Sequence, residues 1–268
     1  MAPKTSLQLF TVREGLEEDF DGTFAELAER GYTAVEPYDF VANADRIAAA
    51  LEKYGMEAPS GHTFIVSESF INPDGSGTEV SVPTWDETFD AAEKLGMTMV
   101  IEPYTDPELW SDPKEIEHIA NRLNAAAKVA AERGLRVGYH NHAHELEAKH
   151  GDQTGLELLE SMLDPEVLLE LDLYWVLRGG VDPVELVKKF GDRVKLVHAK
   201  DGSLDPELVA QYPPADQVVA GTGVVPLAEA IAAAPDLEVA IVEFDHFPGE
   251  SLMDAVEESR VYLDEVTA

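Results

Sequence analysis

The sequence predicts a single-domain α/β protein, a (β/α)8 TIM barrel that spans residues 1–268. Three observations lead to this prediction. Short apolar segments of β-tolerant residues alternate with segments whose apolar residues recur at helical spacing. This cycle repeats eight times, and eight repeats in about 250 residues are typical of a closed barrel rather than a doubly wound sheet. No linker or low-complexity tract indicates a second domain.

The first four cycles fill the N-terminal half of the chain. Strands are predicted at residues 6–11, 33–37, 56–64 and 97–102, and helices at residues 19–30, 43–54, 84–95 and 112–133. A glycine follows each of these helices, where a left-handed residue commonly ends a helix. Residues 65–83 form a longer polar loop with Gly and Pro, for which a lid over a site and an ordinary surface insertion are both open.

The last four cycles begin with a strand at residue 136 that runs directly into histidines. Further strands are predicted at residues 167–172, 194–200 and 238–244, and helices from residue 154, at residues 182–191, at 226–234 and at 251–263. Thr154 is a typical N-cap, and Asp182-Pro183 has the preferred order of a cap followed by proline. An irregular stretch with Gly and Pro occupies residues 201–223.

Polar residues stand at the predicted ends of the strands. All strands of such a barrel deliver their C-terminal ends to one rim, so these residues are expected to converge. They are Gln8, Arg13, Glu36, His62, Glu102, His140, His142, Glu145, Asp172, His198, Lys200, Asp201, Glu243, Asp245 and His246. A buried carboxylate at the end of an apolar run, such as Asp172 or Glu243, requires a metal or another cation, and an ion pair is the alternative for each residue alone.

Three smaller features of this rim each have two interpretations. His140 and His142 stand two apart on a strand and therefore share a face, where they can bind a metal, move protons or remain hydrogen-bonded core residues. Trp175 can stack on a sugar or pack against the rim. The fragment Gly221-Thr-Gly223 can offer backbone amides to an anion, although such fragments are common.

Composition restricts the partners. The chain has no cysteine, so any metal must be held by oxygen and imidazole nitrogen. It has 53 acidic and 19 basic residues, a net charge of −34 that repels nucleic acid and anionic membranes, and we expect neither as a partner. Without a secretory signal or an apolar run near 18 residues, a cytoplasmic location is expected. Composition is compatible with a homo-oligomer.

Six segments together resemble one known superfamily. They are Gln8-Leu-Phe-Thr-Val-Arg13, Gly138-Tyr-His-Asn-His-Ala-His-Glu145, Glu170-Leu-Asp172 with Tyr174-Trp175, His198-Ala-Lys-Asp201, Gly221-Thr-Gly223 and Val242-Glu-Phe-Asp245. This set, which spans nearly the whole chain, resembles the xylose-isomerase-like TIM-barrel sugar (phosphate) isomerases and epimerases. Singly, none of the segments is specific.

The resemblance implies a divalent metal and a small-molecule sugar substrate. The implied ligands are Glu145, Asp172, His198 and Glu243; Mn²⁺ is the expected ion, and Mg²⁺, Co²⁺ or Zn²⁺ are alternatives. The implied reaction is isomerisation or epimerisation of a ketose or related sugar through a metal-stabilised enediolate. Glu145 and Glu243 are implied as proton-transfer groups, with His140 or His142 as the second acid or base. Substrate-binding residues are expected at His62, Glu102, Trp175, Lys200 and Arg13.

Departures from this pattern leave alternatives open. The place of a strand-five ligand is held by Tyr139 or His140, so either Glu145 reaches back or a histidine replaces it. The Tyr-His-Asn-His version also resembles inosose dehydratase-like enzymes and enzymes that open 3-oxo-glycosides, in which β-elimination follows the same enolisation. A metal-dependent lyase on a 3-oxo-glycoside or inosose is therefore the alternative function. A non-catalytic sugar-binding barrel is a third hypothesis, and cleavage of abasic DNA is disfavoured by the charge of −34.

Overall fold

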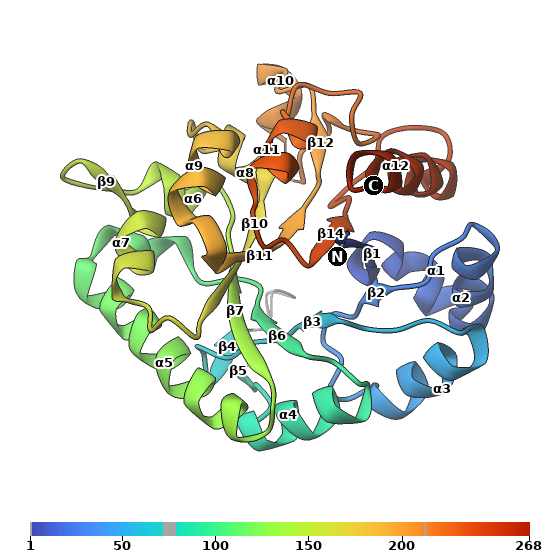
Figure 1. The fold of residues 1–268 in the computed structure, drawn as a ribbon, viewed down its shortest axis with the longest axis horizontal. Coiled ribbons are helices and arrows are strands. Elements are labelled where there is room, and N and C mark those ends of the chain that lie inside the picture. Colours follow the sequence, from blue (N-terminus) through green and yellow to red (C-terminus); the bar gives the residue numbers. More distant parts are fainter. Residues whose placement is uncertain (1, 72–78, 212) are drawn as a thin grey trace.

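Eight parallel strands form one barrel sheet, as the sequence predicts (Figure 1). The computed structural model describes residues 2–71, 79–211 and 213–268. The strands follow the spatial order β2, β1, β14, β11, β10, β7, β6, β3. Their bounds are Lys4–Gln8 (β1), Val35–Glu36 (β2), Ser60–His62 (β3), Met99–Glu102 (β6), Arg136–His140 (β7), Leu168–Asp172 (β10), Val194–His198 (β11) and Val239–Val242 (β14). Parallel bridges from Ala34 to Glu57 and from Tyr38 to His62 connect the β2 and β3 edges and close the barrel.

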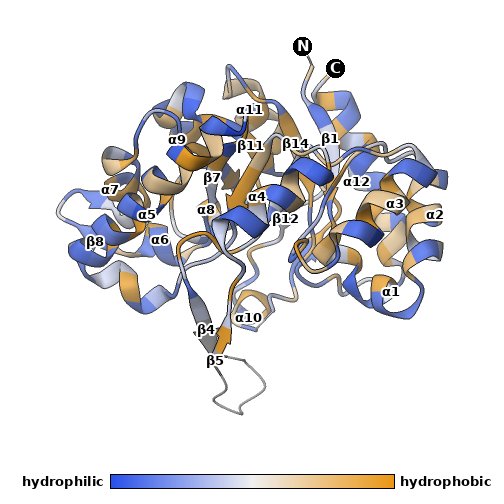
Figure 2. Ribbon diagram, turned by 90° about the horizontal axis from the view of Figure 1, so that it is seen from below, coloured by the Kyte–Doolittle hydropathy of each residue, from blue (hydrophilic) through white to orange (hydrophobic). Residues whose placement is uncertain are grey.

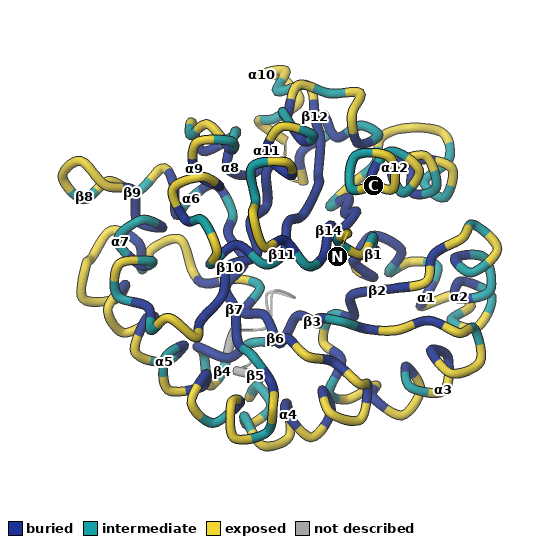
Figure 3. Tube along the Cα trace, in the orientation of Figure 1, coloured by how far each residue is buried: buried dark blue, intermediate teal, exposed yellow. Residues whose placement is uncertain are grey.

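Helices surround the barrel, with exposed outer faces and buried inner faces (Figure 3). The outer helices are Phe20–Glu29 (α2), Ala44–Tyr54 (α3), Trp85–Lys94 (α4), Pro113–Glu132 (α5), Gly155–Met162 (α7), Pro183–Phe190 (α9), Leu227–Ala233 (α11) and Leu252–Val266 (α12). Thr84 and Thr154 form capping boxes with the glutamate three residues later, which explains where α4 and α7 begin. Within the described ranges, no helix is both long and apolar enough to cross a membrane.

Shorter elements decorate the rim at the C-terminal ends of the strands. The helices are Arg13–Glu18 (α1), His144–Glu147 (α6), Leu173–Arg178 (α8) and Pro206–Val209 (α10), with 3-10 turns at Leu9–Val12 and Pro107–Ser111; a further 3-10 turn, Gly191–Arg193, lies at the other end of the barrel, directly before β11. Three hairpins pair Ser69–Ile71 (β4) with Glu79–Ser81 (β5), Lys149–His150 (β8) with Gln153–Thr154 (β9), and Asp201–Gly202 (β12) with Gln217–Val218 (β13). Figure 2 shows the β4–β5 hairpin and α10 on the side opposite the chain termini.

The stretch predicted as a loop at residues 65–83 is therefore partly a hairpin. Antiparallel pairing satisfies its backbone hydrogen bonds from Ser69 to Ser81 and from Ile71 to Glu79. Residues 72–78 lie outside the described part of the chain. The lid role stays a prediction.

The barrel interior changes from apolar to polar along the strand direction. Six side chains form a separate apolar cluster within it: Met99, Ile101, Leu168, Leu196, Val239 and Ile241. Because side chains alternate along a strand, Leu168, Glu170 and Asp172 of β10 fall on the same face, and so do Leu196 and His198 of β11. Carboxylates and imidazoles therefore stand directly above an apolar floor, where each buried charge needs a partner.

Candidate active site

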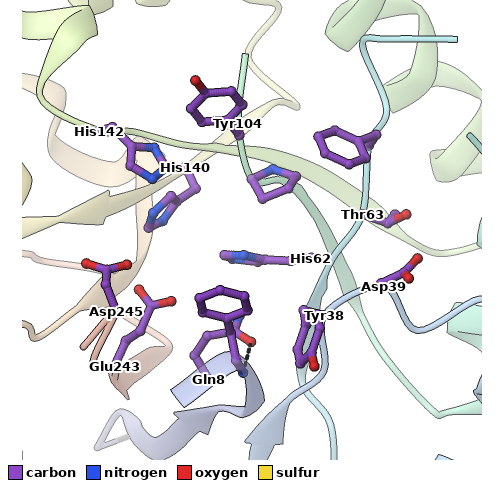
Figure 4. A pocket seen from close by; sticks show the side chains of 13 residues that line it. Gln8, Tyr38, Asp39, His62, Thr63, Tyr104, His140, His142, Glu243 and Asp245 are labelled. Atoms are coloured by element: carbon purple, nitrogen blue, oxygen red, sulfur yellow. Dashed lines mark hydrogen bonds between the residues drawn. The ribbon is translucent and has the colours of Figure 1, made fainter. Parts of the chain in front are cut away.

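A cavity opens at the C-terminal ends of the strands, where a barrel of this type carries its site (Figure 4). Its volume is about 290 Å³. The lining residues are Gln8, Phe10, Tyr38, Asp39, His62, Thr63, Phe64, Pro103, Tyr104, His140, His142, Glu243 and Asp245. Figure 4 shows His140, His142, Glu243 and Asp245 on one side of this space and Tyr38 and Asp39 on the other. Residues from six strand ends or the turns after them thus share one chamber.

Four side chains at the cavity form a group with metal-binding geometry. They are His140, Asp172, His198 and Glu243, and one ligand atom from each lies within 4.8 Å of the others. The first three are the last residues of β7, β10 and β11, and Glu243 directly follows β14. All four are buried. The structure thus brings together three of the four metal ligands implied by the resemblance, together with His140.

A second group of the same kind lies beside it and shares two imidazoles. Its members are His62, His140, Glu170 and His198. One carboxylate oxygen, Glu170 Oε1, lies 2.6 Å from His62 Nε2, 3.1 Å from His140 Nδ1 and 3.1 Å from His198 Nε2. A carboxylate oxygen can only accept hydrogen bonds, so each nitrogen that faces it carries the proton. His140 Nε2 is then left with a lone pair, whereas His198 Nδ1 faces a second carboxylate oxygen, Glu243 Oε2, at 2.7 Å.

Glu36 completes this buried layer. Its carboxylate accepts hydrogen bonds from Gln8 Nε2 at 2.8 Å and Ser60 Oγ at 2.5 Å, and it lies 2.9 Å from His198 Nε2. Burial and the nearby charge of Glu170 raise the pKa of Glu36. Burial also opposes ionisation of Glu170, but the charges of His198 and His62 hold its pKa well below the usual range. Glu170 therefore carries the negative charge of the layer.

The imidazoles differ in charge for the same reason. Burial and the neighbouring charge of His198 lower the pKa of His140 to about 3, so this imidazole is neutral. Burial opposes a charge on His198, but Glu170 and Glu243 raise its pKa well above the usual range. Burial, and to a smaller extent the nearby imidazole of His140, lowers the pKa of His142 well below its ordinary value. His142 therefore enters the cavity as a neutral imidazole.

Lys200 balances the carboxylates of the first group. Its ammonium lies 3.1 Å from Asp172 Oδ2, 2.9 Å from Glu243 Oε2 and 2.7 Å from Asp245 Oδ2. Burial opposes charge on Lys200, but these carboxylates raise its pKa well above the ordinary value. Burial raises the pKa of Asp172 to about 6. Lys200 thus keeps these carboxylates close together in the interior.

The donor set fits a divalent metal. Two imidazoles and two carboxylates suit Mn²⁺, Co²⁺ or Zn²⁺ better than they suit Mg²⁺, because Mg²⁺ prefers oxygen ligands alone. Asp172 Oδ2 is buried and forms no hydrogen bond among the described residues, although Lys200 lies nearby. A buried carboxylate oxygen without a hydrogen bond is costly, and a cation at this position would remove that cost.

Glu145 lies apart from both groups. Its Oε1 accepts a hydrogen bond from the Tyr139 hydroxyl at 2.8 Å, and its Oε2 accepts one from the His142 amide at 2.9 Å. It is fully buried and lines no part of the cavity. In the structure Glu145 therefore does not reach the metal-binding group, because α6 turns this side chain back toward β7. His140 occupies the corresponding place.

The expected substrate-binding residues divide into two sets. His62 lines the cavity, whereas Glu102, Arg13, Lys200 and Trp175 do not. Glu102 accepts the amides of Ile65 and Val66 at 2.6 and 2.7 Å, so it holds the loop after β3. Arg13 lies over the Phe10 ring at 4.1 Å. Trp175 packs against His142 with ring centroids 5.4 Å apart and has a buried indole nitrogen with no described partner.

The Gly221-Thr-Gly223 fragment does not offer its amides to a ligand. Asp201 Oδ2 accepts the amides of Gly221 and Gly223 at 3.0 and 2.9 Å. Its Oδ1 accepts the amides of Gly202 and Val225. The carboxylate of Asp201 thus occupies the position at which the sequence allowed a bound anion.

The sequence reasoning assigned no site role to Glu170. It considered strand ends, and Glu170 stands two residues before the end of β10. A signal was present, because a period of two puts Glu170 on the same inward face as Asp172. An acid at that position in an apolar run is as costly as one at the end of the strand. The same reasoning gave no role to Asp245, which lines the cavity and bonds Lys200.

The fold and the site define a (β/α)8 barrel whose rim holds a buried group of imidazoles and carboxylates beside an open cavity. Residues 24–261 match the family model described as xylose isomerase-like TIM barrel, and the chain belongs to this family. The assignment confirms the resemblance that the sequence motifs indicate.

Individual relatives represent both reaction classes considered from the sequence. An inosose dehydratase of Geobacillus kaustophilus is 28% identical over 197 residues, which cover 68% of this chain and 61% of that relative. The match thus spans less than two thirds of that relative's length. A sugar phosphate isomerase/epimerase of Parabacteroides distasonis has a similar structure, with a TM-score of 0.74, 20% identity and coverage of 98% of this chain and 93% of its own.

A third relative bears on metal binding. The IolI protein, whose crystal structure holds a zinc atom, aligns with a TM-score of 0.69 and 16% identity over 98% of both chains. At this identity the likeness shows the shared fold.

The buried carboxyl of Glu145 predicts a pH-dependent stability. Burial raises its pKa from 4.5 to about 8, so its contribution is complete below pH 4.5 and is lost as the pH rises through about 8. Glu145→Gln should remove this loss, at most about 5 kcal/mol in the free energy of unfolding. Urea unfolding of both proteins between pH 5 and 9 measures the difference. Glu147→Gln, at an exposed carboxylate of the same short helix, is the control. Parallel pH profiles for wild type and Glu145→Gln would contradict the prediction.

Proposed function

We propose that this protein is a divalent-metal-dependent isomerase or epimerase that acts on a keto sugar or related polyol through an enediolate. One observation carries the proposal: His140, Asp172, His198 and Glu243 converge within metal-binding distance at the inner end of a cavity of small-molecule size. Family membership supports a sugar-like substrate. In this proposal His140 takes the ligand position that the sequence analysis gave to Glu145.

A divalent cation held by these four residues would stabilise the negative charge that develops on a carbonyl oxygen when the adjacent C–H loses its proton. Glu243 and His142 both line the cavity and are the proposed proton-transfer groups. His142 is a neutral imidazole, which can accept a proton at one nitrogen while the other donates a hydrogen bond. Lys200 and His198 keep Glu243 ionised. His62 borders the same space and can position a hydroxyl group of the substrate.

Elimination of water from an inosose or opening of a 3-oxo-glycoside is the second candidate. The match to an inosose dehydratase favours it. The first proton transfer is the same in both reactions. The outcome differs in whether the enediolate is reprotonated on carbon or expels a group from the β carbon. The residue that protonates the leaving oxygen decides between them.

The assignment of His140 as a ligand has a direct test. His140→Ala should lower the affinity for Mn²⁺ or Zn²⁺ by at least about 100-fold, because one of four ligands is lost. Glu145→Gln should change it less than about three-fold, since Glu145 contacts the Tyr139 hydroxyl, the His142 amide and His144 rather than the metal-binding group. Isothermal titration calorimetry of both variants provides the measurement. A large loss in Glu145→Gln with little change in His140→Ala would restore Glu145 as the ligand.

The shared carboxylate of Glu170 should increase the metal affinity of the site, although Glu170 does not line the cavity. Glu170→Gln replaces the charged acceptor that His140 and His198 share with a neutral amide, and should lower metal affinity about 10- to 100-fold. The matched control is Glu102→Gln, which alters another buried carboxylate that bonds only backbone amides. Equal metal affinities in the two variants, with both folded by circular dichroism, would argue against this role.

Proton exchange tests the proposed function itself. The metal-loaded protein should exchange the proton beside the carbonyl of D-fructose, D-tagatose or scyllo-inosose in deuterated water, as followed by proton NMR. Chelation should abolish exchange, and Glu243→Gln should lower its rate at least about 100-fold, whereas Glu250→Gln at an exposed site should not. An isomer as product supports the first candidate, and a dehydrated product supports the second. Undiminished exchange by chelated protein would contradict the metal-dependent proposal.

A further inference from the structure

The cavity adjoins the buried metal-binding group, and its described outer part carries no Lys or Arg side chain. Among the thirteen described residues that line it, none is a Lys or Arg. The sequence has no Lys, Arg or His at positions 1, 72–78 and 212, which the structure does not describe. Its only basic lining groups are imidazoles, and two of these, His62 and His140, face the carboxylate of Glu170.

The two cations nearest the cavity are already engaged. The Lys200 ammonium is 1% exposed and lies within 3.1 Å of the carboxylates of Asp172, Glu243 and Asp245. Arg13 donates to the carbonyl oxygens of Phe10 and Asp245. Arg13 lines a neighbouring cavity with Glu14, Glu18 and Glu26, and its guanidinium lies over the Phe10 ring at 4.1 Å. Neither Lys200 nor Arg13 lines the main cavity.

The glycine fragment that the sequence offers for an anion does not replace the missing cation. The amides of Gly221 and Gly223 are donated to Asp201. The cavity wall also includes the carboxylates of Asp39, Glu243 and Asp245, and the chain has a net charge of −34. A phosphate group on the substrate would meet carboxylates here without a compensating partner.

The outer walls suit an uncharged ring. Phe10 and Tyr38 meet edge to face with centroids 5.4 Å apart on one side, and Phe64 and Tyr104 also line the cavity. Phe10 is 37% and Tyr104 is 40% exposed, so part of each ring faces solvent at the mouth. Aromatic faces of this kind pack against the C–H faces of sugars and cyclic polyols and not against phosphate.

We propose that the site takes uncharged substrates, that is, unphosphorylated keto sugars or keto polyols whose part away from the metal group lies against Phe10, Tyr38 and Tyr104, and that it excludes their phosphorylated counterparts. The inference rests on the function proposed above. It goes beyond family membership, since the family comparison includes a protein named sugar phosphate isomerase/epimerase.

Matched substrate pairs test this inference. The Mn²⁺-loaded protein is given D-fructose or D-fructose 6-phosphate, and D-ribulose or D-ribulose 5-phosphate, and proton exchange in deuterated water is followed. The kcat/KM for exchange should be at least about 100-fold higher for the unphosphorylated member, because like charges without a partner are strongly disfavoured. Exchange of the phosphorylated member at an equal or higher kcat/KM would overturn the inference and leave the proposed function intact.

A charge introduced at the mouth sharpens the result. Phe10→Lys should raise kcat/KM for the phosphorylated member at least about ten-fold relative to its partner. Phe10→Met removes the same ring without adding charge and should leave the preference unchanged. Phe10 is partly exposed, so both variants should fold. If both variants change the preference for the unphosphorylated substrate equally, the shape of the wall and not its charge determines this preference, and the inference fails.

The same pairs separate failure of this inference from failure of the proposed function. Exchange of no member of either pair would contradict the proposed function for these sugars. Ligand-observed NMR with the metal-loaded protein then judges substrate charge by binding alone. Stronger binding of the uncharged members supports the inference, whereas stronger or equal binding of the phosphorylated members, or no binding of the uncharged members, overturns it.

Discussion

The site depends on one carboxylate oxygen, Glu170 Oε1, that faces three imidazole nitrogens in the barrel interior. An ionised carboxylate with no exposure to water must be compensated, and His62, His140 and His198 provide that compensation. The same contacts fix which nitrogen of the neutral His140 carries the proton. The free nitrogen of His140 is therefore available to the group that also contains Asp172 and Glu243, and His198 Nδ1 faces Glu243 within that group.

Charge is arranged in layers above the apolar floor of the barrel. Glu170 and Glu36 lie with His62 in the deeper layer, and the metal-binding group lies next to them at the cavity. Lys200 joins the carboxylates of Asp172, Glu243 and Asp245, so its ammonium holds these carboxylates together. Aromatic rings and carboxylates line the cavity mouth. In the proposed function, this distribution of charge determines both metal binding and the choice of substrate.

The sequence predicted the barrel because its signals are local. Helix caps such as Thr154 and Asp182 and the apolar period of each segment depend on neighbouring residues only, and these predictions are confirmed. The polar strand ends were predicted to converge, and the rim bears this out for His140, Asp172, His198 and Glu243. The loop at residues 65–83 was taken as irregular because hairpin pairing joins residues ten or more apart, as Ser69 and Ser81 show. Strand length was also overestimated, since β2 and β3 have only two and three residues.

By itself, the sequence determined the fold, the family and the kinds of side chain at the rim, because strand order and inward alternation follow from the chain's own periodicity. Only the tertiary structure shows that His140, and not Glu145, lies beside Asp172, His198 and Glu243. The turn into α6 gives Glu145 its partners, the hydroxyl of Tyr139 and the amide of His142, within the same segment. His140, still on β7, points inward to partners from β10 and β11. Which of the two side chains reaches this group depends on the direction in which each side chain points, and residue type and spacing do not specify that direction.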